Sequence, residues 1–392
     1  MIIIRTRAYA RAALAGNPSD GYHGKTISII VRNFWAEVVL YEWDSVDIVL
    51  TQDDRARFRS VHDLARDVGL HGYYGGIRLI KATIKRFVDH CRAAGLTLHD
   101  RNFSIRYHST VPRQVGLAGS SAIITATLRA LMQFYEVEIP LHVQPSLVLS
   151  VERDELGVAA GLQDRVAQVF EGLVYMDFGR EHERIVHGLP CFRYEPLDPA
   201  LLPPMYLAHH RGFSEPTEIF HNNIRERFHR GDQEVVAGMA RVAELAAAAR
   251  CALIDRDAGR LGAAMDENFD VRRRVFTLPP WQLQMIDTAR ACGASANFAG
   301  SGGAIVGTYE GGETFAALGQ ALDAIDLRRG HAPSGLSRRR ASGSWPRSQG
   351  MWCAAGLIGL ANRRRAFAAP ICSRSAPGNW FRIATTDGQR AG

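Results

Sequence analysis

Lysine is scarce in this chain of 392 residues, where it occurs only as Lys25, Lys81 and Lys85. No Gly-x-x-x-x-Gly-Lys-(Ser/Thr) segment is present, which excludes a P-loop nucleotide site. Long apolar runs are also missing: Trp352–Ala361 has ten residues, whereas a transmembrane helix needs about 20. The apolar start, Met1–Ile4, is followed at once by arginines and does not predict a signal peptide. We therefore expect a cytoplasmic protein with no membrane partner.

The sequence also lacks closely spaced cysteine pairs, and acidic residues are rare near its C-terminus. The six cysteines include no Cys-x-x-Cys pair, which argues against a disulfide framework or a zinc site. From residue 328 to the end there are 12 arginines and one acid, Asp387, while the rest of the chain holds 35 basic and 39 acidic residues. The net charge of +7 thus comes from the tail, and we expect no nucleic-acid partner. This composition predicts a disordered basic tail. Alternatively, a frame change has replaced the natural C-terminus.

The rest of the sequence has helix and strand patterns in two blocks, which predicts an α+β architecture. Predicted strands cover residues 26–31, 36–41, 103–107, 173–178, 205–209 and 304–309, and predicted helices cover 77–91, 121–135, 147–155, 218–229, 233–249, 283–292 and 314–325. The proline-rich passage Leu197–Pro204 predicts domains at 1–195 and 196–328, followed by the tail at 329–392. No strand pattern follows the last helix, so we expect an unprotected sheet edge and a tail that can be removed with little loss of activity.

A loop rich in glycine and serine, residues 112–122, lies between a predicted strand and a predicted helix. Its residues with a predicted binding role are Pro112, Gly116, Leu117, Ala118, Gly119, Ser120, Ser121 and Ala122. Glycines let the backbone approach a ligand closely, and the free amides that open a helix bind phosphate. The serines could equally serve as a helix cap after a tight turn. The loop is thus a candidate phosphate site.

This loop resembles the phosphate-binding motif of the GHMP kinases, with one extra residue and the first glycine replaced. Residues 10–20 resemble the first motif of sugar kinases such as galactokinase, with Arg11 and Asp20 at matching positions and Asn17-Pro18 in place of Glu-His. Residues 297–303 resemble the third glycine-rich motif. Residues 152–164 match the galactokinase pattern of two carboxylates twelve residues apart. The three motifs, at residues 10–20, 112–122 and 297–303, thus occur in the order found in the family, and the acidic segment lies between the second and the third.

The resemblance implies a two-domain GHMP kinase fold, with a ribosomal-S5-like α/β N-terminal domain and a ferredoxin-like C-terminal domain. It implies ATP and Mg²⁺ as cofactors, with the metal bound by Glu152 and Ser121. It also implies that Asp164 is the general base and that Arg11 stabilises the developing alkoxide. These roles agree with the preference of Mg²⁺ for oxygen ligands and with the gain from a carboxylate near an acceptor hydroxyl. The sugar would contact Asp20, Gly300 and Gly302.

Longer strings, such as 161–168 and 268–274, resemble the plant-type glucuronokinase branch. That resemblance implies phosphorylation of the anomeric hydroxyl of D-glucuronate, a small-molecule sugar acid. Its carboxylate calls for an arginine, and the candidates are Arg78, Arg113 and Arg273, although Arg272–Arg274 fit a solvated helix face equally well. Two alternatives stay open: a kinase for galacturonate, arabinose or galactose, and a catalytically silent sugar sensor. The oligomeric state is not predicted.

Overall fold

Two β-sheets form the framework of the protein. The computed structural model describes residues 2–49, 76–210, 218–329 and 380–383. The larger sheet has six strands, in the order β3-β4-β2-β5-β8 with β1 paired to β2, and the smaller sheet has four strands, in the order β10-β11-β9-β12. The strands of the larger sheet are β1 (Ile3–Ala15), β2 (Lys25–Trp43), β3 (Asp47–Ile48), β4 (Asn102–Ser109), β5 (Leu173–Asp177) and β8 (Arg193–Leu197). Those of the smaller sheet are β9 (Met205–His209), β10 (Asn297–Phe298), β11 (Ala304–Thr308) and β12 (Trp380–Ile383), and β6 (Arg184–Val186) pairs with β7 (Leu189–Cys191) as a separate ribbon.

Strand β2 is the central strand of the larger sheet. It pairs with β1 along one edge, while β4 and β5 take successive parts of the other edge. Because side chains of a strand alternate between faces, Ile29 joins the hydrophobic cluster of α7 (Gln233–Ile254), and Ile30 joins that of α5 (Gln163–Phe170). Both faces of this part of the sheet are therefore covered, and β1 becomes buried throughout from Ala10 to Ala15.

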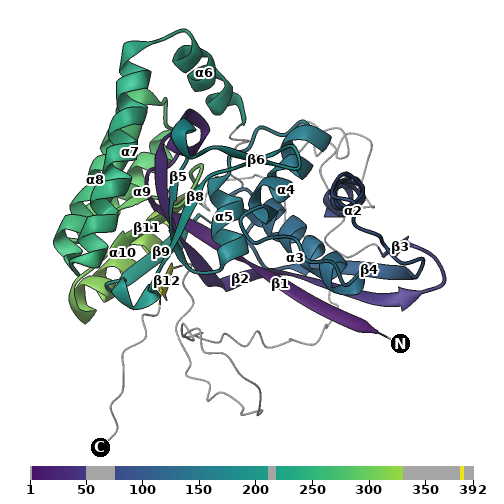
Figure 1. Ribbon diagram of the computed structural model, residues 1–392. Coiled ribbons are helices and arrows are strands. Elements are labelled where there is room, and N and C mark those ends of the chain that lie inside the picture. Colours follow the sequence, from purple (N-terminus) through teal and green to yellow (C-terminus); the bar gives the residue numbers. More distant parts are fainter. Residues whose placement is uncertain (1, 50–75, 211–217, 330–379, 384–392) are drawn as a thin grey trace, which may run out of the picture.

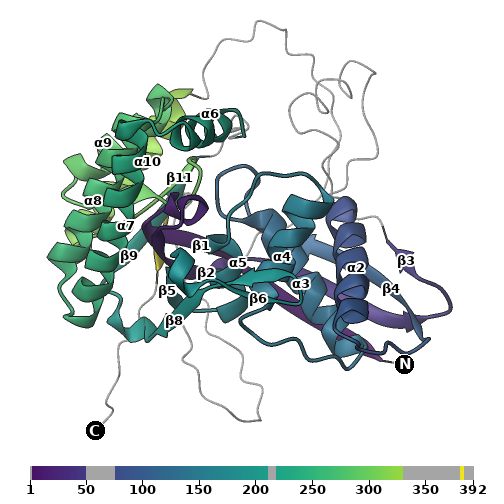
Figure 2. The same ribbon diagram turned by 45° about the horizontal axis from the view of Figure 1, so that its top comes forward.

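Two groups of helices gather at opposite ends of β1 and β2 (Figures 1 and 2). The first group consists of α2 (Gly76–Ala93), α3 (Gly119–Phe134), α4 (Gln144–Ser150) and α5, and the second of α6 (Glu218–His229), α7, α8 (Ala258–Val275), α9 (Pro280–Ala291) and α10 (Gly311–Arg329). Short helical turns occur at η1 (Ser19–Tyr22), η2 (Val151–Glu155), η3 (Arg180–His182) and η4 (Pro199–Leu201). Helix α7 packs on β1 and β2 as well as on α8, so one hydrophobic cluster joins the two sheets.

The α+β prediction is confirmed, with instructive differences. The two strands predicted at 26–31 and 36–41 are one strand, because β2 continues through a register shift opposite Tyr9 and Ala10 of β1. Strand β1 and helix α8 were not predicted. The chain passes from the larger to the smaller sheet between Leu197 and Met205, and β8, in which the predicted boundary at 195 falls, belongs to the larger sheet.

The prediction of an unprotected sheet edge is wrong for β9. This strand pairs with β11 on one side and with β12 on the other, where Phe381 lies opposite Leu207. The strand that covers this edge begins at Trp380, far beyond the end of α10 at Arg329. The prediction considered only the residues that directly follow the helix, and it therefore missed this strand. The tail predicted to be disordered, residues 329–392, contains this strand and the last residue of α10, so the prediction is wrong there; its other residues lie outside the described ranges.

Candidate active site

Arg11 connects three of the motifs through its guanidinium group. Its Nε and Nη2 lie 2.7 and 2.6 Å from Oδ1 of Asp164. Its Nη1 donates to the carbonyl oxygens of Gly116, at 2.9 Å, and of Ala299, at 2.6 Å. Arg11 is only 4% exposed, at the point where β1 becomes buried on both faces. Segments separated by more than 280 residues therefore converge on one buried cation.

Asp164 lies in the first turn of α5, where the helix dipole favours a negative charge. Besides Arg11 it contacts Arg165, whose Nη1 lies 3.2 Å from Oδ2. The same arginine pairs with Glu152, with its Nε 2.9 Å from Oε2. Two cations thus hold the side chain of Asp164 from opposite oxygens. Sequence reasoning did not select Arg165, although it directly follows the predicted base in the string 161–168.

Glu152 and a serine hydroxyl form a pair of oxygens of the kind that Mg²⁺ prefers. Glu152 is 1% exposed, and its Oε1 accepts a hydrogen bond of 2.7 Å from Ser120. Neighbouring ligands of an octahedral Mg²⁺ lie about 3 Å apart, given metal–oxygen distances of about 2.1 Å, so this pair fits that ion. The predicted metal ligand Ser121 is instead buried, and its hydroxyl donates to the carbonyl oxygen of Ala118 at 3.3 Å.

The loop at residues 112–119 leads into α3 with its helix end left open. Ala118 is the N-cap residue, has a left-handed backbone with φ of 62°, and makes no side-chain cap bond. The first amides of a helix have no partners within it, so those after Ala118 are available to an anion. Leu117 is buried and anchors the loop, and Gln168 donates to the carbonyl oxygen of Ala118 at 2.8 Å. Pro112 is half-buried at the start of the loop, and Ala122 packs in the core.

The second glycine loop, residues 299–303, lies directly against the first. A Cβ atom on Gly300 would overlap the carbonyl oxygen of Gly116, and one on Gly116 would lie 2.8 Å from the amide nitrogen of Ser301. Gly302 has φ of 121°, and a side chain there would meet Gln282. The glycines are therefore needed for the contact between the loops, whichever ligand the loops bind.

Asp20, in η1, reaches the same cluster from the other end of the first motif. Its Oδ2 accepts a hydrogen bond of 3.2 Å from the amide of Gln163, and a Cβ atom on Gly161 would overlap that oxygen. Burial and the nearby charge of Asp164 raise the pKa of Asp20 to about 6, against the opposing effects of the Gln163 amide, Arg11 and Arg165. The predicted base and the predicted sugar ligand are thus close neighbours.

Comparison with known proteins is consistent with this geometry. The family model described as GHMP kinases N terminal domain matches residues 78–172, and GHMP kinases C terminal matches residues 245–326. The chain is 43% identical to Glucuronokinase 1 of Arabidopsis thaliana over 312 residues, which are 77% of this chain and 84% of that protein. This chain belongs to the GHMP kinase family.

Solved structures show that the fold is shared as well, which confirms the predicted fold class. Galactokinase of Lactococcus lactis, complexed with galactose, superposes with a TM-score of 0.65 at 14% identity, over 83% of this kinase and 90% of that chain. Phosphomevalonate kinase of Streptococcus pneumoniae, in complex with phosphomevalonate and AMPPNP, gives 0.63 at 15% identity, over 83% and 97%. None of the helices within the described ranges is apolar enough over a sufficient length to span a membrane.

None of the arginines predicted to bind a carboxylate is buried in this cluster. Arg78 and Arg113 are exposed, and so is Arg273, whose side chain lies 3.6 Å from Asp287. The structure instead brings Arg272 to the site: it is 2% exposed and donates to the carbonyl oxygen of Gly300 at 2.8 Å. The helical period could have found it, because Arg272 follows Phe269 by three residues and precedes Phe276 by four.

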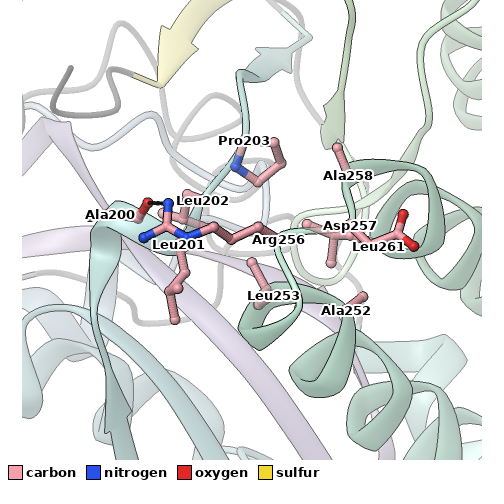
Figure 3. A pocket seen from close by; sticks show the side chains of 10 residues that line it. All are labelled: Ala200, Leu201, Leu202, Pro203, Ala252, Leu253, Arg256, Asp257, Ala258 and Leu261. Carbon is pink, nitrogen blue, oxygen red and sulfur yellow. Dashed lines mark hydrogen bonds between the residues drawn. The ribbon is translucent and has the colours of Figure 1, made fainter.

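A separate pocket of about 120 Å³ lies between η4 and the turn that joins α7 to α8 (Figure 3). Most of its lining residues are apolar, with Leu201, Leu253 and Leu261 among them. Arg256 crosses it and donates to the carbonyl oxygen of Ala200 at 3.3 Å. No predicted site residue lines this pocket, so we do not assign it to the kinase reaction.

Proposed function

We propose that this kinase transfers the γ-phosphoryl group of ATP to the anomeric hydroxyl of D-glucuronate. The observation that carries the proposal is the placement of Asp164 near Asp20 and between Arg165 and Arg11, the arginine that also binds both glycine loops. The similarity to a protein named glucuronokinase supports the choice of sugar. The buried and mutually paired charges argue against the silent sensor, which would not need a carboxylate held in this way.

In the proposed reaction, the oxygen of the anomeric hydroxyl attacks the γ-phosphorus, and the bond from that phosphorus to the bridging oxygen of ADP breaks. Asp164 accepts the hydroxyl proton, as a carboxylate within hydrogen-bond reach can do. Arg11 remains beside the oxygen that gains charge, and the open amides of α3 bind the phosphate groups. Phosphoryl transfer depends mainly on such positioning and electrostatic stabilisation.

We further propose that Ser120 and Glu152 hold Mg²⁺, with Arg165 fixing the carboxylate from its other oxygen. When bound, the ion would neutralise phosphate charge. We expect Glu152→Gln to raise the magnesium concentration at half-maximal rate by about tenfold or more, because a charged ligand becomes neutral. The matched control is Glu155→Gln, whose carboxylate pairs with Lys85 outside the cluster. Equal magnesium dependence of the two variants would remove Glu152 from the metal site.

The function is tested by measuring ADP release from Mg-ATP with a panel of uronic acids and neutral sugars. We expect D-glucuronate to give the highest kcat/KM and a product phosphorylated at the anomeric oxygen. A higher kcat/KM for galacturonate, arabinose or galactose would reassign the substrate. Binding of a sugar without any ADP release would favour the sensor.

A further inference from the structure

Three arginines are buried in the active site, and only two of them have a carboxylate partner. Arg11 pairs with Asp164, and Arg165 pairs with Glu152. Arg272 is equally buried, yet within the described ranges it makes no ion pair with an acid. Burial and the nearby charge of Arg11 lower its pKa to about 10. A buried cation without an anion is unfavourable, so this position is suited to a ligand that brings one.

The hydrogen bonds of Arg272 leave one edge of its guanidinium unused. Its Nη1 donates to the carbonyl oxygen of Gly300 at 2.8 Å and to Oδ1 of Asn17 at 3.2 Å. Its Nε is buried with no hydrogen-bond partner, and no acceptor for Nη2 is found among the described residues. The N–H groups of Nε and Nη2 point in the same direction, and such a parallel pair matches the two oxygens of a carboxylate.

The guanidinium is also held in a fixed position. The rings of Phe298 and Phe276 lie with their centroids 5.0 and 5.2 Å from its central carbon. One helical turn earlier on α8, Asn268 binds the amide of Gly16 at 2.7 Å and the carbonyl oxygen of Asn17 at 3.3 Å. Helix α8 therefore docks the first motif, three residues before Asp20, and fixes Arg272 beside it.

We infer that Arg272 binds the carboxylate of the sugar acid and so selects uronic acids over neutral sugars. The inference rests on the proposed function, since a neutral sugar offers no carboxylate. Asp20 lies on the same short segment as Asn17, and Gly300 lies against Gly116 and Arg11. A sugar that contacts Asp20 and presents its anomeric oxygen to Asp164 is thus placed among residues that contact Arg272. A neutral sugar would leave the cation without its counter-charge.

The experiment compares Arg272→Gln with wild type on D-glucuronate and on its neutral amide, D-glucuronamide. We expect kcat/KM for glucuronate to fall about 10²–10³-fold, as is usual when one partner of a buried charge pair is removed. The value for the amide should change by less than about fivefold, because the amide does not need the cation. Arg274→Gln is the matched control, on the same helix and exposed, and should change kcat/KM for neither substrate by more than about twofold.

Arg272→Lys keeps the test valid if the glutamine variant does not fold. It retains the charge but loses the two parallel donors, so we expect about a tenfold loss for glucuronate and little change for the amide. An equal loss for both substrates would make Arg272 a structural link between α8 and the loops, and would overturn the inference. An unchanged preference for glucuronate would overturn it too.

Calorimetric binding of D-glucuronate separates this inference from the proposed function. Wild-type binding that weakens in Arg272→Gln, without any phosphorylation, would support the inference while the proposed function fails. Phosphorylation of glucuronate with an unaltered preference in Arg272→Gln would support the function alone. A wild-type protein that neither binds nor phosphorylates glucuronate would overturn both.

Discussion

The part of the chain that forms the larger sheet and the part that forms the smaller sheet contribute different chemical groups to the candidate active site. The part with the larger sheet supplies the carboxylates, Asp20, Glu152 and Asp164, together with the arginines that pair with two of them. The part with the smaller sheet supplies backbone carbonyls at residues 299 and 300 and the cation of Arg272. In the proposed mechanism the reaction chemistry therefore falls to the first part, while the second part contributes the proposed contact with the substrate carboxylate. Single substitutions in each part should therefore give different kinetic signatures.

The largest effect is expected for Asp164→Asn, which keeps the shape of the side chain but removes the charge that accepts the proton. Turnover should fall about 10²–10⁴-fold, while the affinity for nucleotide, which depends on the loop before α3, should hardly change. Turnover and nucleotide affinity measured on the same preparation check this. Asp154→Asn is the control, because Asp154 is exposed and pairs with Arg153. Full turnover in Asp164→Asn would show that the carboxylate has only a structural role. The proposed general base would then not lie in the part of the chain with the larger sheet.

Gly300→Ala tests the contact between the two parts. The new methyl group would overlap the carbonyl oxygen of Gly116, so the loops must move apart. A displacement of about 1 Å can cost about 10²-fold in rate, and we expect a loss of about 10–10²-fold with every sugar tested. Gly312→Ala is the control, since nothing lies within 4 Å of a Cβ atom there. Wild-type rates in Gly300→Ala would show that the contact between the loops does not position the reactants.

A smaller effect concerns the pH dependence of stability. The pKa of Asp20 is raised from 3.8 to about 6, so between these values the folded state holds more protons than the unfolded state. The free energy of unfolding should therefore fall as the pH rises from about 4 to 6, by about 2 kcal/mol. Denaturant unfolding of Asp20→Asn should lack this fall, whereas Asp100→Asn, at an exposed site, should retain it. If the free energy of unfolding depends on pH in the same way for wild type and Asp20→Asn, the pKa of Asp20 is not raised, and its environment is more polar than the structure indicates.

Sequence reasoning located the motifs but not the contacts between them. Helix α6 was predicted to its terminal residues and β9 likewise, because local periodicity determines such elements. The choice between Ser120 and Ser121 depends on which hydroxyl meets Glu152, and adjacent residues of a helix point in different directions. The same holds for Arg272 and Arg273, of which one is buried and the other exposed. Strand β12 was missed because its partner β9 lies far away in sequence.

The smallest effect is expected from shortening the chain at its C-terminus, which tests the sheet edge of the second part. Removal of residues 330–392 deletes β12 and leaves β9 with one unpaired edge. The lost backbone hydrogen bonds should lower the free energy of unfolding by about 1–2 kcal/mol, and therefore the Tm by a few degrees. Turnover should stay within about twofold, because β12 contributes nothing to the carboxylate cluster. Removal of residues 384–392 alone is the control and should leave the Tm unchanged. If both truncated proteins melt at the same temperature as the full chain, β9 does not depend on β12 for its stability.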